Sequence, residues 1–341
     1  MNLNKILESL RCETEEIKIM EVCGTHTSSI YKNGIRDLLS SGIRLVSGPG
    51  CPVCVTSVGA IDQLLAYAMQ GNCTILSFGD MMRVKGSKRS LSEAKAEGAN
   101  VHLMYSPLEV VSLATQNTNH QFIVAAVGFE TTIPIYAVLL DLLIKQNITN
   151  VKLYTICKTM PEVLEYVCIN ESIDAFLCPG HVSVIVGSNS YQDLCDRYKK
   201  PFVIAGFEAE HILTAIYEIM IQKKKGIPQI KNLYKSVVTP DGQKKALELI
   251  NKYFIKSDTY WRGIGEIKNS GYLIREEFAR FSANKQEIQI QQTDNGCRCS
   301  EVILGRIMPD ECTLFKTICN PENPVGACMV SSEGTCRICC M

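Results

Sequence analysis

The stretch IKIMEVCGTHT at residues 17–27 sets the pattern of the whole chain. Its first six residues form a short apolar run typical of a strand, and the last five form a glycine-containing turn with polar side chains. Seven more such runs follow: IRLVSG at 43–48, TILSFG at 74–79, NVHLMY at 100–105, FIVAAVGF at 122–129, VKLYTIC at 151–157, IDAFLCPG at 173–180 and PFVIAGFE at 201–208. Amphipathic segments lie between them, so the succession predicts parallel β-α-β units.

The fold class expected from this rhythm is α/β, with two related, Rossmann-like, parallel-sheet domains over residues 15–120 and 121–226. Residues 58–70 have apolar positions at helical spacing, and Ser90 and Glu93 are spaced as a capping box. From residue 227 the strand pattern fades. We therefore expect a third, C-terminal domain at 227–341, with 1–14 as a candidate addition, that is mostly helical or irregular.

Composition excludes several classes of partner. Lysine plus arginine equals aspartate plus glutamate, at 35 each in 341 residues, so no electrostatic argument favours nucleic acid. No apolar run approaches the roughly 20 residues that span a bilayer, and the first 20 residues lack the apolar core of a signal peptide. We expect a cytoplasmic protein with no membrane or nucleic-acid partner.

The first motif with chemical potential is CGTHT, which begins at Cys23 and includes His26. It follows a predicted strand, where a helix N-terminus is expected to lower the pKa of the thiol and favour thiolate. Thiolate and imidazole are both good ligands for a soft or borderline metal. A buried cysteine beside an N-capping threonine is an equally weighted alternative for this motif taken alone.

The second motif is SGPGCPVC at residues 47–54, with Cys51 and Cys54 separated by two residues. This spacing allows the two sulfurs to form a redox disulfide or to bind one metal ion. A turn by itself does not require two cysteines, so we favour a chemical role.

Three more turns place an ionisable side chain after an apolar strand: Asp80 in FGD, Glu130 in GFETT and His181 in PGH. If they converge on one cleft, these side chains could orient a ligand or move protons. Taken separately, each fits a helix cap or a hydrogen-bonded loop residue better than a catalytic one. Parallel strands favour convergence, because ligands of open α/β sheets bind at the carboxyl ends of the strands.

Cysteines are concentrated near the C-terminus. Eight of the 17 in the chain lie in its last 45 residues, at positions 297, 299, 312, 319, 328, 336, 339 and 340. A reducing compartment would not keep them paired as structural disulfides, which favours metal ligation. Zinc and an iron-sulfur cluster both accept four thiolates, and the wide spacing of 297, 312, 319 and 336 favours a cluster. The adjacent pair Cys339 and Cys340 is poorly placed for joint ligation and is expected to be exposed.

Five strings resemble the HypD family of hydrogenase maturation proteins. They are MEVCGTHT at 20–27, GPGCPVC at 48–54, GFETT at 128–132, PGHVS at 179–183 and NPVGACMVSSEG at 323–334, in the order of the family and over nearly the whole chain. The resemblance implies three domains and a [4Fe-4S] cluster. The cysteine pattern of the family falls on Cys297, Cys312, Cys319 and Cys336, which are the implied cluster ligands.

The resemblance also implies a function, that of a scaffold on which the Fe(CN)2CO unit of [NiFe]-hydrogenases is made. The implied partners are a small chaperone, HypC, the cyanide donor HypE and, through HypC, the hydrogenase large subunit. Cys23 would hold the mononuclear iron that carries CN and CO, with His26 in the same motif, and Cys51 and Cys54 would be a redox pair. The remaining family motifs contain Asp80, Glu130, His181 and Glu333, which are expected to line the cleft or support the cluster.

Electrons for reductive steps could come from the cluster through Cys299, Cys328 or the 51/54 pair. A rival function is an iron-sulfur-dependent thiol/disulfide oxidoreductase that acts on a partner protein. It would use the same cluster and disulfide but would leave Cys23 and His26 without a role. A third alternative is a zinc-stabilised interaction module.

Overall fold

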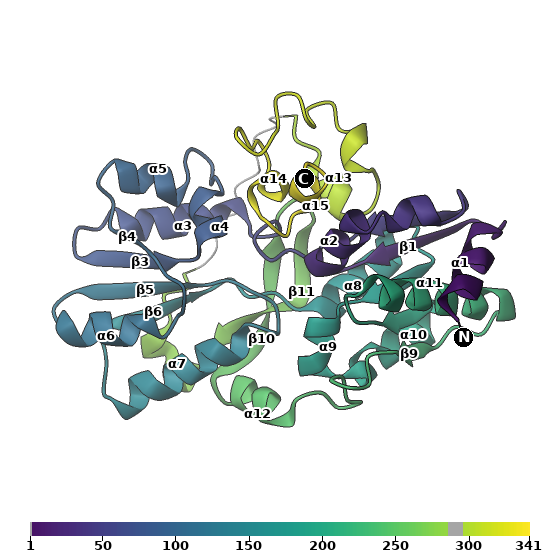
Figure 1. The fold of residues 1–341 in the computed structure, drawn as a ribbon. Helices are drawn as coiled ribbons and strands as arrows, with labels where there is room; N and C mark the ends of the chain where they lie inside the picture. Colours follow the sequence, from purple (N-terminus) through teal and green to yellow (C-terminus); the bar gives the residue numbers. More distant parts are fainter. Residues whose placement is uncertain (1, 286–295) are drawn as a thin grey trace.

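The computed structural model describes residues 2–285 and 296–341, and within them the chain forms two parallel sheets covered by helices. Figure 1 shows the two α/β units beside each other, with the C-terminal segment above the region where they meet. All eight predicted strands are present, and the α/β fold class is confirmed.

The first sheet has five parallel strands. Their spatial order is β2 (Ile43–Ser47), β1 (Ile17–Glu21), β7 (Ala175–Cys178), β8 (Phe202–Ile204) and β9 (Ile230–Asn232). Side chains alternate along β1, so that Ile19 packs in the core under one face and Met20 in the core under the other. The first face is covered by α1 (Leu3–Arg11), α2 (Gly24–Lys32), the 3-10 turn η1 (Ile35–Leu38) and α11 (Ala209–Lys225). The second is covered by α8 (Met160–Asn170), α9 (Gly180–Val186), the 3-10 turn η2 (Ser188–Tyr191) and α10 (Gln192–Tyr198).

The second sheet has four parallel strands. Their order is β4 (Val101–Leu103), β3 (Cys73–Ser77), β5 (Gln121–Ala126) and β6 (Val151–Thr155). One face carries α3 (Val58–Ala68), α4 (Gly79–Arg83) and α5 (Leu91–Ala96). The other carries α6 (Glu109–Gln116), α7 (Ile133–Lys145) and α12 (Lys244–Tyr253). The predicted capping box of Ser90 and Glu93 is formed at the start of α5.

The sheets do not follow the predicted division at residue 120. β1 pairs with β7, more than 150 residues further along the chain, whereas β3 pairs with β5. The chain therefore leaves the first unit after β2, completes the second, and returns to the first at β7. A β-α-β rhythm looks the same whether successive strands share a sheet or not, so periodicity alone could not locate the two crossings.

The region after residue 227 is less helical than predicted. Strand β9 extends the first sheet, and β10 (Phe254–Trp261) pairs with β11 (Gly265–Ile274) in an antiparallel hairpin. The rest is irregular, as expected, with short helices at η3 (Glu276–Phe281), α13 (Cys299–Ile303), η4 (Pro309–Glu311), α14 (Ala327–Val330) and α15 (Thr335–Ile338). Met329 packs in the core of the first unit and Val330 in that of the second, so the C-terminal segment joins both.

Candidate functional site

The carboxyl ends of four neighbouring strands bring the first two motifs together. β2, β1, β7 and β8 lie side by side in parallel, and the CPVC, CGTHT and PGH turns follow the first three. The turn after β8 contributes Gly206 and Phe207. These turns form the candidate site, at the sheet edge where the sequence predicts it.

Cys23 occupies the N-cap position of α2, with extended backbone, and its thiol is only partly accessible. The prediction that the pKa of the Cys23 thiol is lowered is wrong. Burial raises the pKa of this thiol to about 11, despite hydrogen bonds from Thr25 and the backbone of His26 that lower it. Desolvation of the thiolate outweighs the helix N-terminus at this position, so the free side chain is a neutral thiol near pH 7.

Glu21, the last residue of β1, is a member of the site that the sequence reading missed. It is almost fully buried, and Thr27 Oγ1 donates a hydrogen bond to its Oε1 at 2.6 Å. The backbone N–H of Cys23 donates to its Oε2 at 3.3 Å. The carboxyl group thus joins both ends of the CGTHT turn. Burial raises its pKa to about 7, although these hydrogen bonds and the charge of Arg36 act in the opposite direction.

His26 is fully buried, and its Nε2 lies 3.1 Å from the carbonyl oxygen of Gly206. A carbonyl can only accept, so Nε2 carries the proton and Nδ1 has a free lone pair. Nδ1 is buried and has no hydrogen-bond partner among the described residues. Burial lowers the pKa of His26 to about 4, so the ring is neutral at physiological pH.

An aromatic ring separates the two histidines of the site. Phe207 stacks on His181 with ring centroids 4.2 Å apart and contacts His26 at 4.7 Å on a tilted ring. Burial also lowers the pKa of His181. The structure therefore brings His181 to the same site as His26, through a phenylalanine that carries no chemical signal in the sequence.

Cys51 and Cys54 form a disulfide, the first of the two predicted alternatives. The turn that holds it lies directly against Cys23. A Cβ atom on Gly50 would be 2.5 Å from the carbonyl carbon of Val22 and 2.6 Å from the backbone nitrogen of Cys23. Both sulfurs are buried, and Cys54 Sγ is 3.9 Å from the carbonyl oxygen of Ala327 in the C-terminal segment.

The SSEG turn at 331–334 packs against Gly24, the residue after Cys23. A Cβ atom on Gly24 would be 2.7 Å from the carbonyl oxygen of Glu333. Asp80 holds this turn, because its Oδ2 accepts from Ser332 N, Ser332 Oγ and Ser331 Oγ at 2.9, 2.9 and 3.2 Å. Burial would raise the pKa of Asp80, but these bonds and Arg83 bring it below its usual value. Desolvation and the Asp80 charge raise the pKa of Glu333, whose side chain remains exposed.

Glu130 is buried in the turn after β5 in the second unit, where Met160 N donates to its Oε1 at 2.8 Å. Its Oε2 has no hydrogen-bond partner among the described residues. Burial raises its pKa to about 7. Among the described residues, Glu130 makes no hydrogen bond to Cys23 or His26; its contact is with Met160, at the junction of β5 and α8.

Six cysteines of the C-terminal segment line one small cavity: 297, 299, 312, 319, 328 and 336. The four predicted cluster ligands are all among them. Hydrogen bonds link the thiols in the order Cys297, Cys299, Cys328 and Cys336, and they shift the pKa values of these groups. The remaining walls are mostly apolar, with Val302, Leu314, Phe315 and Met329. In the described ranges, no three histidine, cysteine, aspartate or glutamate side chains are already arranged around a single metal position.

Cys339 and Cys340 lie outside this cavity. Cys339 is buried, which differs from the expected exposure, and Cys340 is half-buried. Helix α15 packs against α2, and Tyr31 Oη donates to the carbonyl oxygen of Cys339 at 3.3 Å. Packing of the chain end against the first unit explains the difference.

No helix in the described parts of the chain is long and apolar enough to cross a membrane.

Comparison with known proteins agrees with the five motifs. The HypD family model, described as "Hydrogenase formation hypA family", matches residues 1–341. A putative hydrogenase expression/formation protein of Methanocaldococcus jannaschii is 41% identical, over 98% of this chain and 94% of the relative. Hydrogenase maturation factors HypD of Escherichia coli (37%, 94% and 87%) and Azotobacter vinelandii (36%, 94% and 88%) are also similar. This chain belongs to the HypD family of hydrogenase maturation proteins.

Proposed function

We propose that this protein is the scaffold on which the Fe(CN)2CO unit of [NiFe]-hydrogenases is assembled. The observation that carries the proposal is the position of Cys23, whose backbone lies against the disulfide turn, whose neighbour Gly24 lies against the SSEG turn, and which shares its motif with a neutral histidine. A site with one soft ligand and few competing ones suits an iron atom that must accept cyanide and CO, which favour low-spin Fe(II).

Cys23 would bind the iron as thiolate. Its raised pKa means that the proton must leave as the metal binds, and the charge of the metal then compensates the buried thiolate. Glu21 positions the thiol through the hydrogen bond from Cys23 N. The free lone pair on Nδ1 of His26 can accept a proton or ligate the iron, and Phe207 holds the ring in place.

We assign the resident [4Fe-4S] cluster to Cys297, Cys312, Cys319 and Cys336. The donor set fits, because thiols are the ligands that such clusters require and six of them line one mostly apolar cavity. When bound, the cluster would supply electrons one at a time. The disulfide of Cys51 and Cys54 would take up two electrons and two protons to become two thiols. Cys299 and Cys328 line the same cavity and remain candidates for relaying electrons from the cluster.

The proposed partners are a HypC-type chaperone, whose cysteine would share the iron with Cys23, and HypE as the source of cyanide. The loaded iron would pass to the hydrogenase large subunit through the chaperone. The carboxylate of Asp80 fixes the SSEG turn beside Cys23, and Glu333 belongs to that turn. His181 supports the His26 ring through Phe207.

The test is anaerobic co-purification of the full chain with its HypC-type chaperone, followed by iron and sulfide analysis and infrared spectroscopy. We expect iron in excess of the cluster and infrared bands of bound cyanide and CO. Cys23→Ala should abolish these bands while the cluster content stays unchanged. Wild-type protein that has a cluster but neither extra iron nor these bands would contradict the scaffold.

A thiol/disulfide oxidoreductase is the second candidate function. It is favoured by the contact of Cys54 with Ala327, whose neighbour Cys328 lines the cysteine cavity. This function predicts that Cys51→Ala abolishes reduction of a partner disulfide and that Cys23→Ala has no effect on it. The two variants therefore separate the two functions.

A further inference from the structure

Among the described residues, Arg262 at the tip of the β10–β11 hairpin makes no hydrogen bond or ion pair with a carboxylate, although the charge of Asp62 acts on it from further away. Its Nε donates to the carbonyl oxygen of Thr56 at 2.7 Å, and its NH2 group donates to that of Lys85 at 3.0 Å. The side chain is half-buried, and desolvation lowers the pKa of the guanidinium to about 10, so it stays charged at neutral pH. A charge removed from water is unfavourable unless an opposite charge lies nearby.

The residues around Arg262 place it next to the cysteine cavity. Arg262 and Gly326 line the same 110 Å3 hollow. A Cβ atom on Gly326 would lie 2.4 Å from Cys297 Sγ and 3.5 Å from Cys299 Cβ. The neighbouring Gly263 packs against Ser300, the residue after Cys299: a Cβ atom on Gly263 would lie 2.4 Å from the Cβ of Ser300.

The same hairpin tip also touches the disulfide turn. The backbone N–H of Arg262 donates to the carbonyl oxygen of Val55 at 2.8 Å, one residue after Cys54. Trp261 makes an isolated bridge with Thr56. Arg262 is thus placed between the disulfide and the cavity that contains the candidate cluster ligands.

We propose that Arg262 is a positioning residue whose cation is the counter-charge of the iron-sulfur cluster and raises its reduction potential. The proposal rests on the proposed cluster. Four thiolates give a cluster a net negative charge, and reduction adds one more negative charge, so a nearby cation stabilises the reduced state more than the oxidised one.

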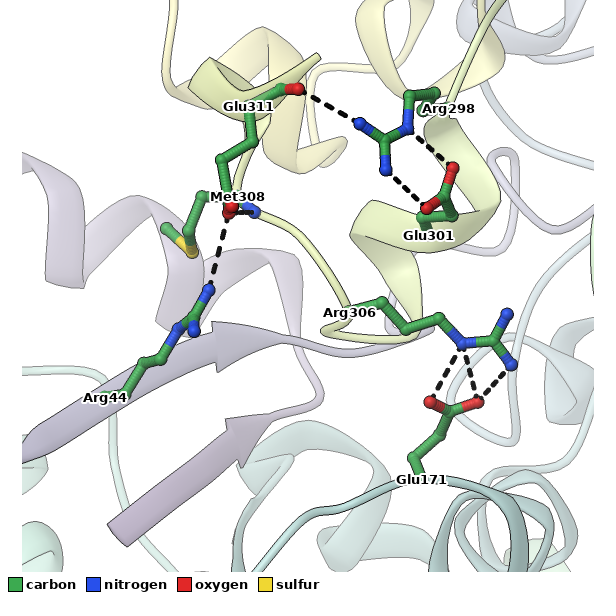
Figure 2. Close-up of polar contacts among 7 residues, drawn as sticks. All are labelled: Arg44, Glu171, Arg298, Glu301, Arg306, Met308 and Glu311. Carbon is green, nitrogen blue, oxygen red and sulfur yellow. Dashed lines mark hydrogen bonds and ion pairs between the residues drawn. The ribbon is translucent and has the colours of Figure 1, made fainter. Parts of the chain in front are cut away.

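Arg298 provides a matched control. It lies between Cys297 and Cys299 in the sequence, but its Nε and NH2 donate to the Glu301 carboxylate at 2.7 and 2.6 Å. Figure 2 shows this fork, with a further bond to the backbone of Glu311. The carboxylate already neutralises Arg298, so removal of both charges leaves the local field little changed.

The experiment is a redox titration of the full-length holoprotein, followed by the electron paramagnetic resonance signal of the reduced cluster. In Arg262→Gln we expect a lower midpoint potential, with the reduction equilibrium shifted about tenfold, which is about 59 mV for one electron. Arg262→Lys keeps the charge and should stay near the wild-type value. Arg298→Gln combined with Glu301→Gln should also leave the potential unchanged.

An unchanged potential in Arg262→Gln, or an equal shift in the Arg298/Glu301 variant, would overturn the proposal. If Arg262→Gln loses the cluster, the iron content of Arg262→Lys is measured instead. The proposal requires that Arg262→Lys retains the cluster. Loss in both variants would assign Arg262 a role through hydrogen bonds instead of charge. A wild-type protein without a cluster would contradict both the proposed function and this inference. A wild-type protein with a normal cluster, whose potential is the same in the Arg262 variants, would contradict this inference alone.

Discussion

At the scale of single residues, burial decides the charge states near the site. The thiol of Cys23 stays protonated although it caps a helix, because removal of a thiolate from water outweighs the helix N-terminus. Burial likewise raises the pKa of Glu21 and Glu130 to about 7. The sequence shows which groups can ionise, whereas their burial depends on packing between segments far apart in the chain.

Glu130→Gln should make the protein more stable at high pH. The pKa of Glu130 rises from 4.5 to about 7 on folding, so the folded state prefers the protonated form. Its stabilising contribution is complete below pH 4.5 and is lost as the pH rises through about 7. Glutamine keeps an acceptor for Met160 N and carries no charge, so we expect a gain of about 2 kcal/mol at pH 8.

Urea unfolding of both proteins at pH 5 and pH 8 measures this difference. The control is Glu322→Gln, at an exposed position, which should leave the pH dependence unchanged. A Glu130→Gln variant that loses stability between pH 5 and pH 8 as steeply as wild type would show that Glu130 does not cause the loss. Glu21 contributes its own share of the slope in both proteins.

At the scale of elements, glycines allow the turns after β1 and β2 to touch. Gly50→Ala should disrupt this contact, because the new Cβ would lie 2.5 Å from the carbonyl group of Val22. The atoms that the new Cβ would meet belong to the backbone of Val22 and Cys23, and they cannot move aside as a flexible side chain would. We expect a loss of about 1–3 kcal/mol in unfolding free energy, and faster alkylation of Cys23 as the turns separate.

Gly71→Ala is the matched control. A Cβ atom at Gly71 has nothing within 4 Å, so its stability and the reactivity of Cys23 should stay at wild-type values. Denaturation by urea and alkylation followed by mass spectrometry measure the two effects. Equal behaviour of the two alanine variants would mean that the turns adapt without cost.

The local rhythm of the chain was enough to predict every strand up to β8, since each is a short apolar run followed by a turn. It was not enough to predict which strands pair, because β1 meets β7 only through contacts far apart in sequence. The β10–β11 hairpin was missed for a different reason. Strand β10 is buried only at its ends, at Phe254 and Trp261, and the exposed or half-buried residues between them include charged ones that resemble a polar segment.

At the scale of the molecule, the candidate site depends on how the C-terminal segment sits on the two α/β units. The motif cysteines and histidines could be identified from the sequence because their side chains have distinctive chemistry. Glu21, Phe207 and Arg262 could not be, since each acts through a neighbour that only the fold provides. Figure 2 shows ion pairs that hold the C-terminal segment against the first unit.

Arg306→Ala should weaken this docking. Both oxygens of Glu171 accept from Arg306, at 3.0 and 3.1 Å from Nε and 2.6 Å from NH2, and the Glu171 side chain is only 6% exposed. Loss of the guanidinium leaves a nearly buried carboxylate unpaired, for which we expect a loss of about 1–3 kcal/mol in urea unfolding. Arg44→Ala removes a pair with both partners half exposed and should cost about 0.5 kcal/mol or less.

Adding Glu171→Gln to Arg306→Ala should recover most of the loss, because the unpaired charge is gone. If the double variant is as unstable as Arg306→Ala, the loss comes from packing of the arginine stem and the ion pair does not hold the segment in place.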